Sequence, residues 1–244
     1  MTAPLFLASS EELAGSQLVL SGDEGHHAAD VRRLVLGERV DLSDGAGLVV
    51  SCTVASVRRG EVVLDVLSRH HEPIPAPRVT VIQALPKGDR SELAVEMMTE
   101  FGVDEIVPWA ASRCVAVWRG ERAERGVERW RAVARESAKQ SRRAWIPEVS
   151  ELASTSEVAA RLAAASHPIV LHSDGMAPLS WVTLDESSSA AVVVGPEGGI
   201  TDDELATFTK AGATTCRLGP HVLRTSTAGG AAVAVLLSRS RRWS

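Results

Sequence analysis

The pattern of apolar and polar positions changes character near residue 73. Before this point, short runs rich in β-branched residues alternate with polar ones and are separated by turn residues such as Asp44-Gly45. Period-two runs of this kind, with Asp-Gly between them, are typical of strands joined by tight turns. The predicted strand segments are 16–20, 38–57 and 61–68. The first part of the chain therefore predicts a small β-barrel-like module.

Beyond residue 78, short apolar runs alternate with longer segments in which apolar residues recur at helical spacing. The runs indicate buried strands and the longer segments indicate helices. Strands are predicted at 78–85, 104–110, 168–173, 189–195 and 214–219, and helices at 91–102, 121–143, 201–212 and 226–239. This alternation predicts an α/β fold with a mostly parallel sheet covered by helices on both faces, and ligands in such folds bind beyond the carboxyl ends of the strands.

The stretch "HHEPIPAPRV" separates the two patterns. Pro73, Pro75 and Pro77 alternate there, which excludes a helix and indicates a stiff extended connector. We therefore predict a first domain at 1–72, a linker at 73–78 and a second domain at 79–244.

Composition places the chain among globular proteins. It has 244 residues, of which 45% are hydrophobic and 23% charged. The N-terminal sequence lacks the features of a secretory signal, and no apolar stretch approaches the ~20 residues of a membrane span, so a cytoplasmic protein is expected. Cys52, Cys114 and Cys216 are far apart and have no zinc-ligand spacing, which predicts packed thiols and no metal.

Charge is distributed unevenly although the net value is only -5. Residues 113–148 hold 10 Lys or Arg against 5 Asp or Glu, and residues 213–244 hold 5 against none. Within 121–143, one helical stripe is basic: Arg131, Arg135, Lys139 and Arg142. Such a stripe is either a solvated face or a surface for RNA phosphates, and the shortage of matching acids favours RNA.

Two glycine-bearing loops follow predicted strands and precede predicted helices. "GPEGG" at 195–199 leads into a helix whose start has the Thr201–Glu204 capping-box spacing, and "LGPHVLRTSTAGG" begins at Leu218. A tight turn would explain one such loop, but two at one sheet edge, with "LHSDG" at 171–175 as a third wall, predict a backbone-lined pocket. Walker and dinucleotide fingerprints are absent, which excludes the common phosphate-binding loops. A backbone-lined pocket with Glu197 near its mouth suits a neutral or cationic adenosine compound.

These loops, with "RWRAVARESAKQSRRAWIPEV" and "HHAADVRRLVLGERVDLSDGAG" upstream, resemble the bacterial 16S rRNA uridine-N3 methyltransferases of the SPOUT superfamily. The resemblance covers nearly the whole chain. It implies an N-terminal PUA-like β-barrel that binds RNA and a C-terminal domain with a trefoil knot. It further implies a homodimer that uses S-adenosyl-L-methionine and acts on 16S rRNA or the small ribosomal subunit.

The resemblance also assigns residues to the cofactor. The matched positions are Leu171, His172, Gly195, Pro196, Glu197, Gly198, Gly199, Leu218, Gly219, Val222, Leu223 and Thr227. For RNA, it marks His26, His27 and Arg33 in the barrel and Gln140 on the long helix. Ser226 and Met97 stand where many relatives have Glu and Lys.

Methyl transfer from a sulfonium is an in-line displacement that needs positioning but no metal. Because N3 of uridine carries a proton, the site must favour the anionic ring or supply a base. Arg224 and Arg143 are candidates for the cationic role, and Glu197 for the base or for loop structure. The expected function is methylation of N3 of a uridine in 16S rRNA. The alternatives are a SPOUT methyltransferase for another base and a non-catalytic RNA-binding or assembly factor.

Overall fold

The computed structural model describes residues 3–88 and 90–243. The chain forms two compact units: Met1–Ile74 with Ala138–Ile146, and Pro75–Ser137 with Pro147–Ser244. The division after Ile74 falls inside the proline-rich connector. The inclusion of Ala138–Ile146 in the first unit differs from the predicted division, because pairing with distant residues rather than position along the chain decides where this segment belongs.

The first unit holds a curled sheet that has, among its described residues, five strands in the order β1-β3-β4-β5-β2. Its strands are β1 (Leu5–Leu7), β2 (Gln17–Leu20), β3 (Arg39–Ser43), β4 (Leu48–Arg58) and β5 (Glu61–His71). Alternate residues of β4, including Val50, Cys52 and Val54, are buried and form the core with residues of β2, β3 and β5 and of η2 (His27–Val31), which directly follows α1 (Gly22–His26). This arrangement confirms the predicted β-rich module.

The segment Ala138–Ile146 completes this unit by pairing with the turn between β3 and β4. The amide of Gly47 donates to the carbonyl of Ala144 at 3.0 Å, and the amide of Ile146 donates to the carbonyl of Gly45 at 3.0 Å. Trp145 donates through Nε1 to the carbonyl of Glu72 at 3.2 Å and packs edge-on against the His71 ring. Trp145 is therefore held by packing inside the unit.

The second unit is built on a sheet whose described strands number seven, in the order β10-β12-β9-β11-β6-β7-β8. They are β6 (Arg78–Ala84), β7 (Glu105–Trp109), β8 (Glu148–Val149), β9 (His167–Leu171), β10 (Ala177–Pro178), β11 (Ser189–Val194) and β12 (Thr214–Arg217). Each neighbouring pair is parallel, as predicted. The carboxyl ends of these strands consequently meet at one edge.

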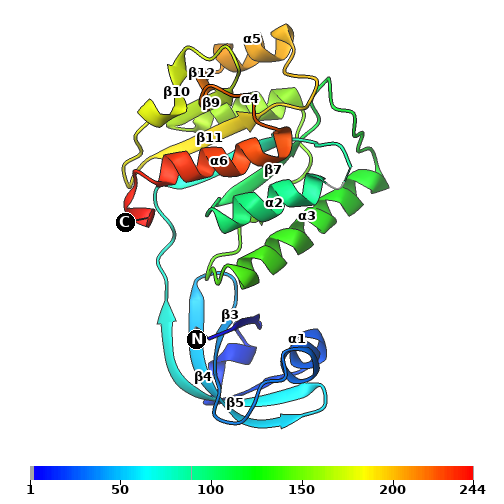
Figure 1. The fold of residues 1–244 in the computed structure, drawn as a ribbon, viewed down its shortest axis with the longest axis vertical. Helices are drawn as coiled ribbons and strands as arrows, with labels where there is room; N and C mark the ends of the chain where they lie inside the picture. Colours follow the sequence, from blue (N-terminus) through cyan, green and yellow to red (C-terminus); the bar gives the residue numbers. More distant parts are fainter. Residues whose placement is uncertain (1–2, 89, 244) are drawn as a thin grey trace. The chain divides into compact units, whose positions relative to one another are not determined.

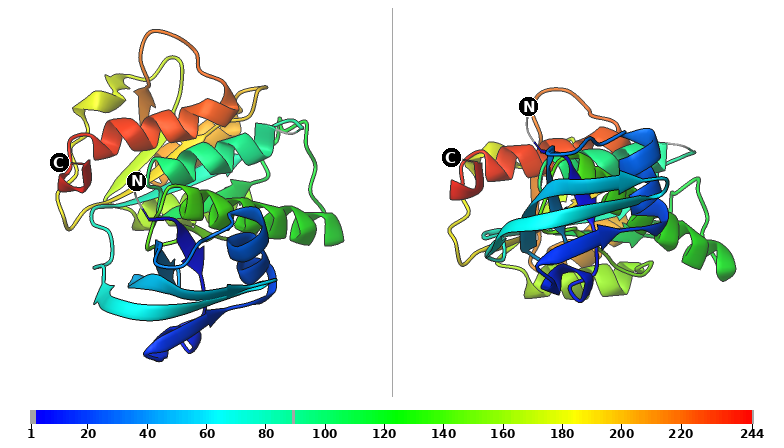
Figure 2. Two further views of the ribbon diagram at one scale, coloured as in Figure 1. Left: turned by 60° about the horizontal axis from the view of Figure 1, so that its bottom comes forward. Right: turned by 90° about the horizontal axis from the view of Figure 1, so that it is seen from below.

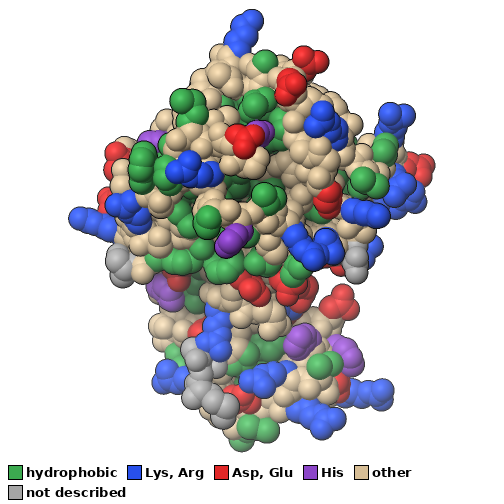
Figure 3. All heavy atoms as spheres, turned by 45° about the horizontal axis from the view of Figure 1, so that its top comes forward, with side chains coloured by type: hydrophobic (Ala, Val, Ile, Leu, Met, Phe, Trp, Pro, Cys, Tyr) green, Lys and Arg blue, Asp and Glu red, His purple; other side chains and the backbone are tan. Residues whose placement is uncertain are grey.

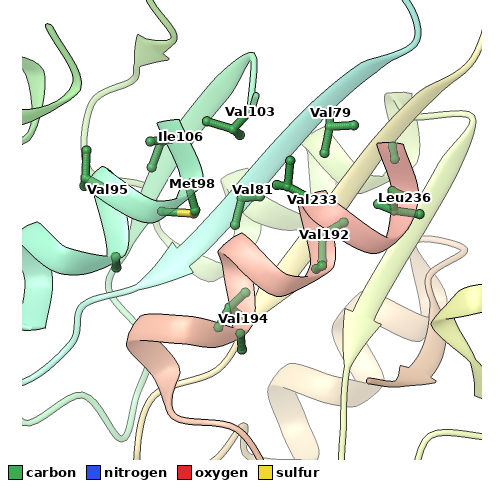
Figure 4. Packing of buried hydrophobic residues seen from close by; sticks show 14 of the residues in the cluster. Val79, Val81, Val95, Met98, Val103, Ile106, Val192, Val194, Val233 and Leu236 are labelled. Carbon is green, nitrogen blue, oxygen red and sulfur yellow. The ribbon is translucent and has the colours of Figure 1, made fainter. Parts of the chain in front are cut away.

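Helices cover both faces of this sheet (Figures 1 and 2). One face carries α2 (Arg90–Glu100), α6 (Thr225–Leu237) and the part of α3 (Glu121–Gln140) that belongs to this unit, whereas α4 (Thr155–Ala164) and α5 (Asp202–Lys210) cover the other. Because side chains alternate along a strand, Val79 and Val81 of β6 pack under α2 and α6 (Figure 4), while Ile82 lies in the opposite core.

Several elements were not predicted from the sequence: α4 and the short strands β1, β8 and β10. Helix α4 begins at Ser154, whose hydroxyl accepts from the Glu157 amide in a capping box. All three cysteines are free, two of them buried, and no metal-binding group occurs within 3–88 and 90–243. Over the same residues, the helices are too short or too polar to cross a membrane.

Candidate functional site

A cavity of about 740 Å³ opens at the carboxyl edge of the parallel sheet. Its walls come from the loops that follow β9, β11 and β12, and further residues follow β6 and β7. The lining comprises Arg90, Arg113, Leu171, His172, Ser173, Asp174, Val194, Gly195, Pro196, Glu197, Gly199, Ile200, Asp202, Arg217, Leu218, Gly219, Pro220, His221, Val222, Leu223, Arg224, Thr225 and Ala228. This size is typical of a small-molecule or cofactor site.

The loop after β11 needs its glycines because other atoms approach it closely. A Cβ on Gly195 would lie 2.8 Å from the side chain of Ile200. A Cβ on Gly198 would lie 2.9 Å from Cβ and 3.1 Å from the carbonyl oxygen of Arg113. Gly199 has a φ of +76°, in the left-handed region that favours glycine. The loop is therefore shaped by packing, and not only by the turn that it makes.

Three hydrogen bonds tie this loop to its neighbours. The carboxylate of Glu197 accepts from the Lys87 amide at 3.1 Å, and Arg113 donates through Nη1 to the carbonyl of Gly198 at 3.2 Å. The hydroxyl of Thr225, in the first turn of α6, donates to the carbonyl of Gly195 at 3.0 Å. These bonds connect the loop to the segments that follow β6 and β7 and to the first turn of α6, so the cavity wall is preorganised.

Glu204 fixes the start of α5 beside the same loop. Its carboxylate accepts from the amide of Thr201, which confirms the predicted capping box, and also from the amide of Ser112 at 2.7 Å. Burial alone would raise the pKa of Glu204, but the hydrogen bonds from Ser112 and Thr201 outweigh it and hold the pKa below its ordinary value. The ionised carboxylate thus locks the segment after β7 against α5.

The other two walls follow β9 and β12. In the first, Nδ1 of His172 accepts from the amide of Asp174 at 3.2 Å, and a Cβ on Gly175 would lie 2.4 Å from the backbone of Cys216. In the second, Gly219 has a φ of +95° and Val222 is 87% exposed. The loop after β9 is pressed against β12, whereas the loop before α6 projects outward.

Most of the predicted cofactor residues line this cavity, as do Glu197 and Arg224. Gly198 and Thr227 lie beside it: Gly198 packs on Arg113, and the Thr227 hydroxyl donates to the carbonyl of Arg224 at 3.2 Å. Arg143 belongs to the first unit, and its role in the reaction stays a prediction.

The predicted RNA residues differ in their surroundings. In the first unit, His26 is exposed and contacts Asp30 at 2.9 Å, the His27 ring packs on Phe6, and Arg33 is exposed. Exposed positions also include Gln140 and Arg142 of the first unit and Arg135 of the second. On the face shown in Figure 3, Lys and Arg side chains lie scattered among Asp and Glu in each unit.

Two members of the basic stripe are used by the fold. Lys139 is 6% exposed, and its ammonium lies 2.7 Å from the Glu24 carboxylate. This burial gives the Lys139 charge a structural role, and we leave Lys139 out of the proposed RNA contacts. Arg131 donates hydrogen bonds to both Glu151 and Glu128, and these carboxylates raise the pKa of Arg131 above its ordinary value.

Sequence reasoning missed several residues of the lining, among them Arg90, Arg113, Arg217 and Asp202. Arg90 and Arg113 follow predicted strands, so their position just beyond a strand end was the available signal. Ser226 on α6 and Met97 on α2 depart from the family pattern. Ser226 is buried, and a Cβ added at Gly230 of α6 would lie 3.2 Å from Cβ of Met97.

The fold and the cavity define a two-unit α/β protein whose parallel sheet carries a backbone-lined ligand site. Comparisons identify the family. A family model described as an RNA methyltransferase domain matches residues 72–237, and one described as an RNA methyltransferase PUA domain matches residues 20–67.

Named relatives cover nearly the whole chain. A Mycobacterium tuberculosis protein named ribosomal RNA small subunit methyltransferase E is 46% identical over 247 residues, which covers 100% of this chain and 94% of the relative. A Bacillus subtilis protein of the same name is 31% identical over 217 residues, with 86% and 85% coverage. The chain therefore belongs to the RNA methyltransferase family of these proteins, as the sequence motifs predicted.

Solved structures agree with this assignment. A putative methyltransferase from Legionella pneumophila in complex with bound S-adenosylmethionine matches with a TM-score of 0.85 at 26% identity, covering 98% of this chain and 99% of that one. A ribosomal RNA small subunit methyltransferase E from Neisseria gonorrhoeae, bound to S-adenosyl methionine, matches with a TM-score of 0.83 at 25% identity, covering 97% and 98%.

Proposed function

We propose that this protein transfers a methyl group from S-adenosylmethionine to small-subunit ribosomal RNA, at N3 of a uridine. The observation that carries the proposal is the cavity of about 740 Å³ at the carboxyl edge of the parallel sheet, lined by three glycine-bearing loops. Family membership and the S-adenosylmethionine complexes of similar structures support the choice of cofactor. The N3 position comes from the sequence resemblance alone.

The residues present fit this cofactor. Close packing at Gly195 and Gly198 in the loop after β11, and at Gly175 in the loop after β9, leaves no room for a side chain at these positions. Main-chain amides and carbonyls of these loops would bind an adenosine group. Glu197 lines the cavity, and its carboxylate would hold the positively charged part of the cofactor. The bound cofactor supplies an electrophilic methyl group on a sulfonium.

The protein's own contribution is positioning and charge. Arg224 is the N-cap residue of α6 and lines the cavity, where its guanidinium favours the uracil ring after loss of the N3 proton. One carboxylate oxygen of Glu197 accepts from the Lys87 amide, so Glu197 also holds the loop. We assign Glu197 to cofactor binding and loop structure. If Glu197 also removes the N3 proton, it does so through the carboxylate oxygen that does not accept from Lys87.

Further expectations accompany this function. We expect the second domain to be knotted, which is supported by the insertion of β12 between β9 and β10. We expect a homodimer, supported by the exposure of Met176 (88%) and Trp181 (73%). We expect the exposed residues Arg135, Gln140 and Arg142, together with His26, His27 and Arg33 of the first unit, to contact RNA.

Transfer of labelled methyl to small subunits that lack their native uridine methylation tests the function, followed by mass mapping of the product. Label at N3 of one uridine is expected. A Gly198→Arg variant serves as the negative control because a long side chain there must enter the space of Arg113. Label on another base would contradict the N3 assignment, and cofactor binding without transfer to any ribosomal RNA would favour an assembly factor.

A further inference from the structure

The cavity has two sides that differ in chemistry. The loops after β9, β11 and β12 bring the glycine-bearing backbone that fits the cofactor, whereas Arg90 and Arg113 follow β6 and β7. In the sheet, β11 separates β6 and β7 on one side from β9 and β12 on the other. The two arginines therefore approach the cavity from the side away from the cofactor loops that follow β9 and β12.

The cofactor alone does not explain the charge of the side chains that line the cavity. Its described lining carries four arginines, Arg90, Arg113, Arg217 and Arg224, against three carboxylates, Asp174, Glu197 and Asp202. S-adenosylmethionine has a net positive charge, so an excess of guanidinium groups opposes its binding. An anion that entered with the other substrate would match this excess.

Neither arginine is explained by an ion pair within the described residues. Arg113 uses one N–H for the Gly198 carbonyl, which leaves further donors of its fork for a ligand. Its backbone is held because the preceding residue, Ser112, donates to Glu204. Arg90 is the first residue of α2, where a positive charge is unfavourable to the helix dipole, so helix stability does not account for it.

We propose that Arg90 and Arg113 bind a phosphodiester of the substrate RNA next to the target base and so hold that base against the cofactor side of the cavity. Guanidinium groups suit this role because their paired donors match phosphate oxygens. Arg113 also connects this contact to the cofactor loop through Gly198, so RNA and cofactor meet at one preorganised wall. This inference rests on the proposed function and identifies residues that bind the RNA substrate.

The test compares RNA binding by the full-length protein across a salt series. The variants are Arg90→Ala, Arg113→Ala and Arg113→Lys, with Lys210→Ala as the charge control at the far end of α5. The probe is a transcript of small-subunit ribosomal RNA. Affinity for S-adenosylmethionine and the KM for each substrate are measured on the same proteins, and melting curves establish that each variant is folded.

Each alanine variant is expected to bind RNA about tenfold more weakly at 0.1 M salt. The slope of log K against log salt should fall in magnitude by about 0.7–0.9 for each lost phosphate contact. Arg113→Lys and Lys210→Ala should keep the parent slope. Arg90→Ala should not weaken cofactor binding, because no described hydrogen bond joins Arg90 to the cofactor loops and loss of its positive charge does not oppose a cationic ligand.

Parent slopes in both alanine variants would overturn the proposal. Loss of cofactor affinity with an unchanged salt slope would also overturn it, since the arginines would then serve the cofactor's carboxylate. The proposed function fails separately, if the parent protein transfers no methyl group to ribosomal RNA, because the salt slopes are measured without turnover.

Discussion

Gly198→Ala probes the cofactor loop with the smallest change that the structure allows. The added Cβ would lie 2.9 Å from Cβ and 3.1 Å from the carbonyl oxygen of Arg113. Favourable carbon–carbon contacts need about 3.5–4.0 Å, so an overlap of roughly 0.6–1 Å must be relieved. The backbone after β7 cannot yield freely because Ser112 is bonded to Glu204. The loop at 195–199 must move instead.

The expected effect follows from the cost of such overpacking, which is typically about 1–3 kcal/mol. If restoring the binding geometry requires this free energy, the affinity for S-adenosylmethionine falls by about 5–150-fold. Calorimetric titration with S-adenosylmethionine measures this loss, and methyl transfer should fall with it at subsaturating cofactor. Parent affinity in a folded Gly198→Ala protein would refute the reasoning that close packing on Arg113 shapes the loop.

Gly126→Ala is a matched control for this experiment. Its Cβ would lie 2.7 Å from the ring of Trp118, an overlap of the same kind, but Gly126 is on α3 and does not line the cavity. We expect Gly126→Ala to change the melting temperature and to leave cofactor affinity unchanged.

Two further predictions concern stability. Because its folded-state pKa is depressed, Glu204 contributes stability that is complete above its ordinary pKa of 4.5 and is lost as pH falls through the lower folded-state value. Glu204→Gln should therefore lower the free energy of unfolding by about 1–3 kcal/mol at pH 7, with a difference that narrows toward pH 3 in urea titrations; a pH-independent difference would contradict this. Arg242 donates to Asp104 at 2.7 Å, and the Asp104 side chain is 5% exposed. Arg242→Ala should cost about 3–5 kcal/mol in the same assay, part of it recovered by adding Asp104→Asn, whereas a loss below ~1 kcal/mol would count against the pair.

The large elements of the second unit were predictable because each has a strong period. Helix α4 was not, since Val158 and Leu162 are its only buried residues and the rest of "TSEVAARLAA" is small or polar. Two apolar positions one turn apart make too weak a stripe to separate a helix from a loop. The capping-box spacing from Ser154 to Glu157 was the usable signal.

The parts of the site that are formed by a single continuous segment of the chain were predictable. "GPEGG" and "LGPHVLR" each lie between a strand and a helix, so the chain itself places them at the carboxyl edge. Arg113 could not be assigned in this way. Its place in the cavity depends on β7 pairing beside β6 and on Gly198 accepting its hydrogen bond, and both are relations between segments that are far apart in sequence.

The basic stripe of α3 shows why a periodic pattern identifies a helix face but not its partner. The spacing of Arg131, Arg135 and Lys139 places them on one face, and this holds whether solvent, RNA or protein covers it. The three residues have different surroundings in the structure. Arg131 forms ion pairs with two carboxylates, Lys139 is buried and forms an ion pair with Glu24, and Arg135 is exposed. Glu24 precedes Lys139 by 115 residues, so only the folded first unit brings this pair together. A charge stripe is therefore evidence for nucleic-acid binding only at the positions that the fold leaves at the surface.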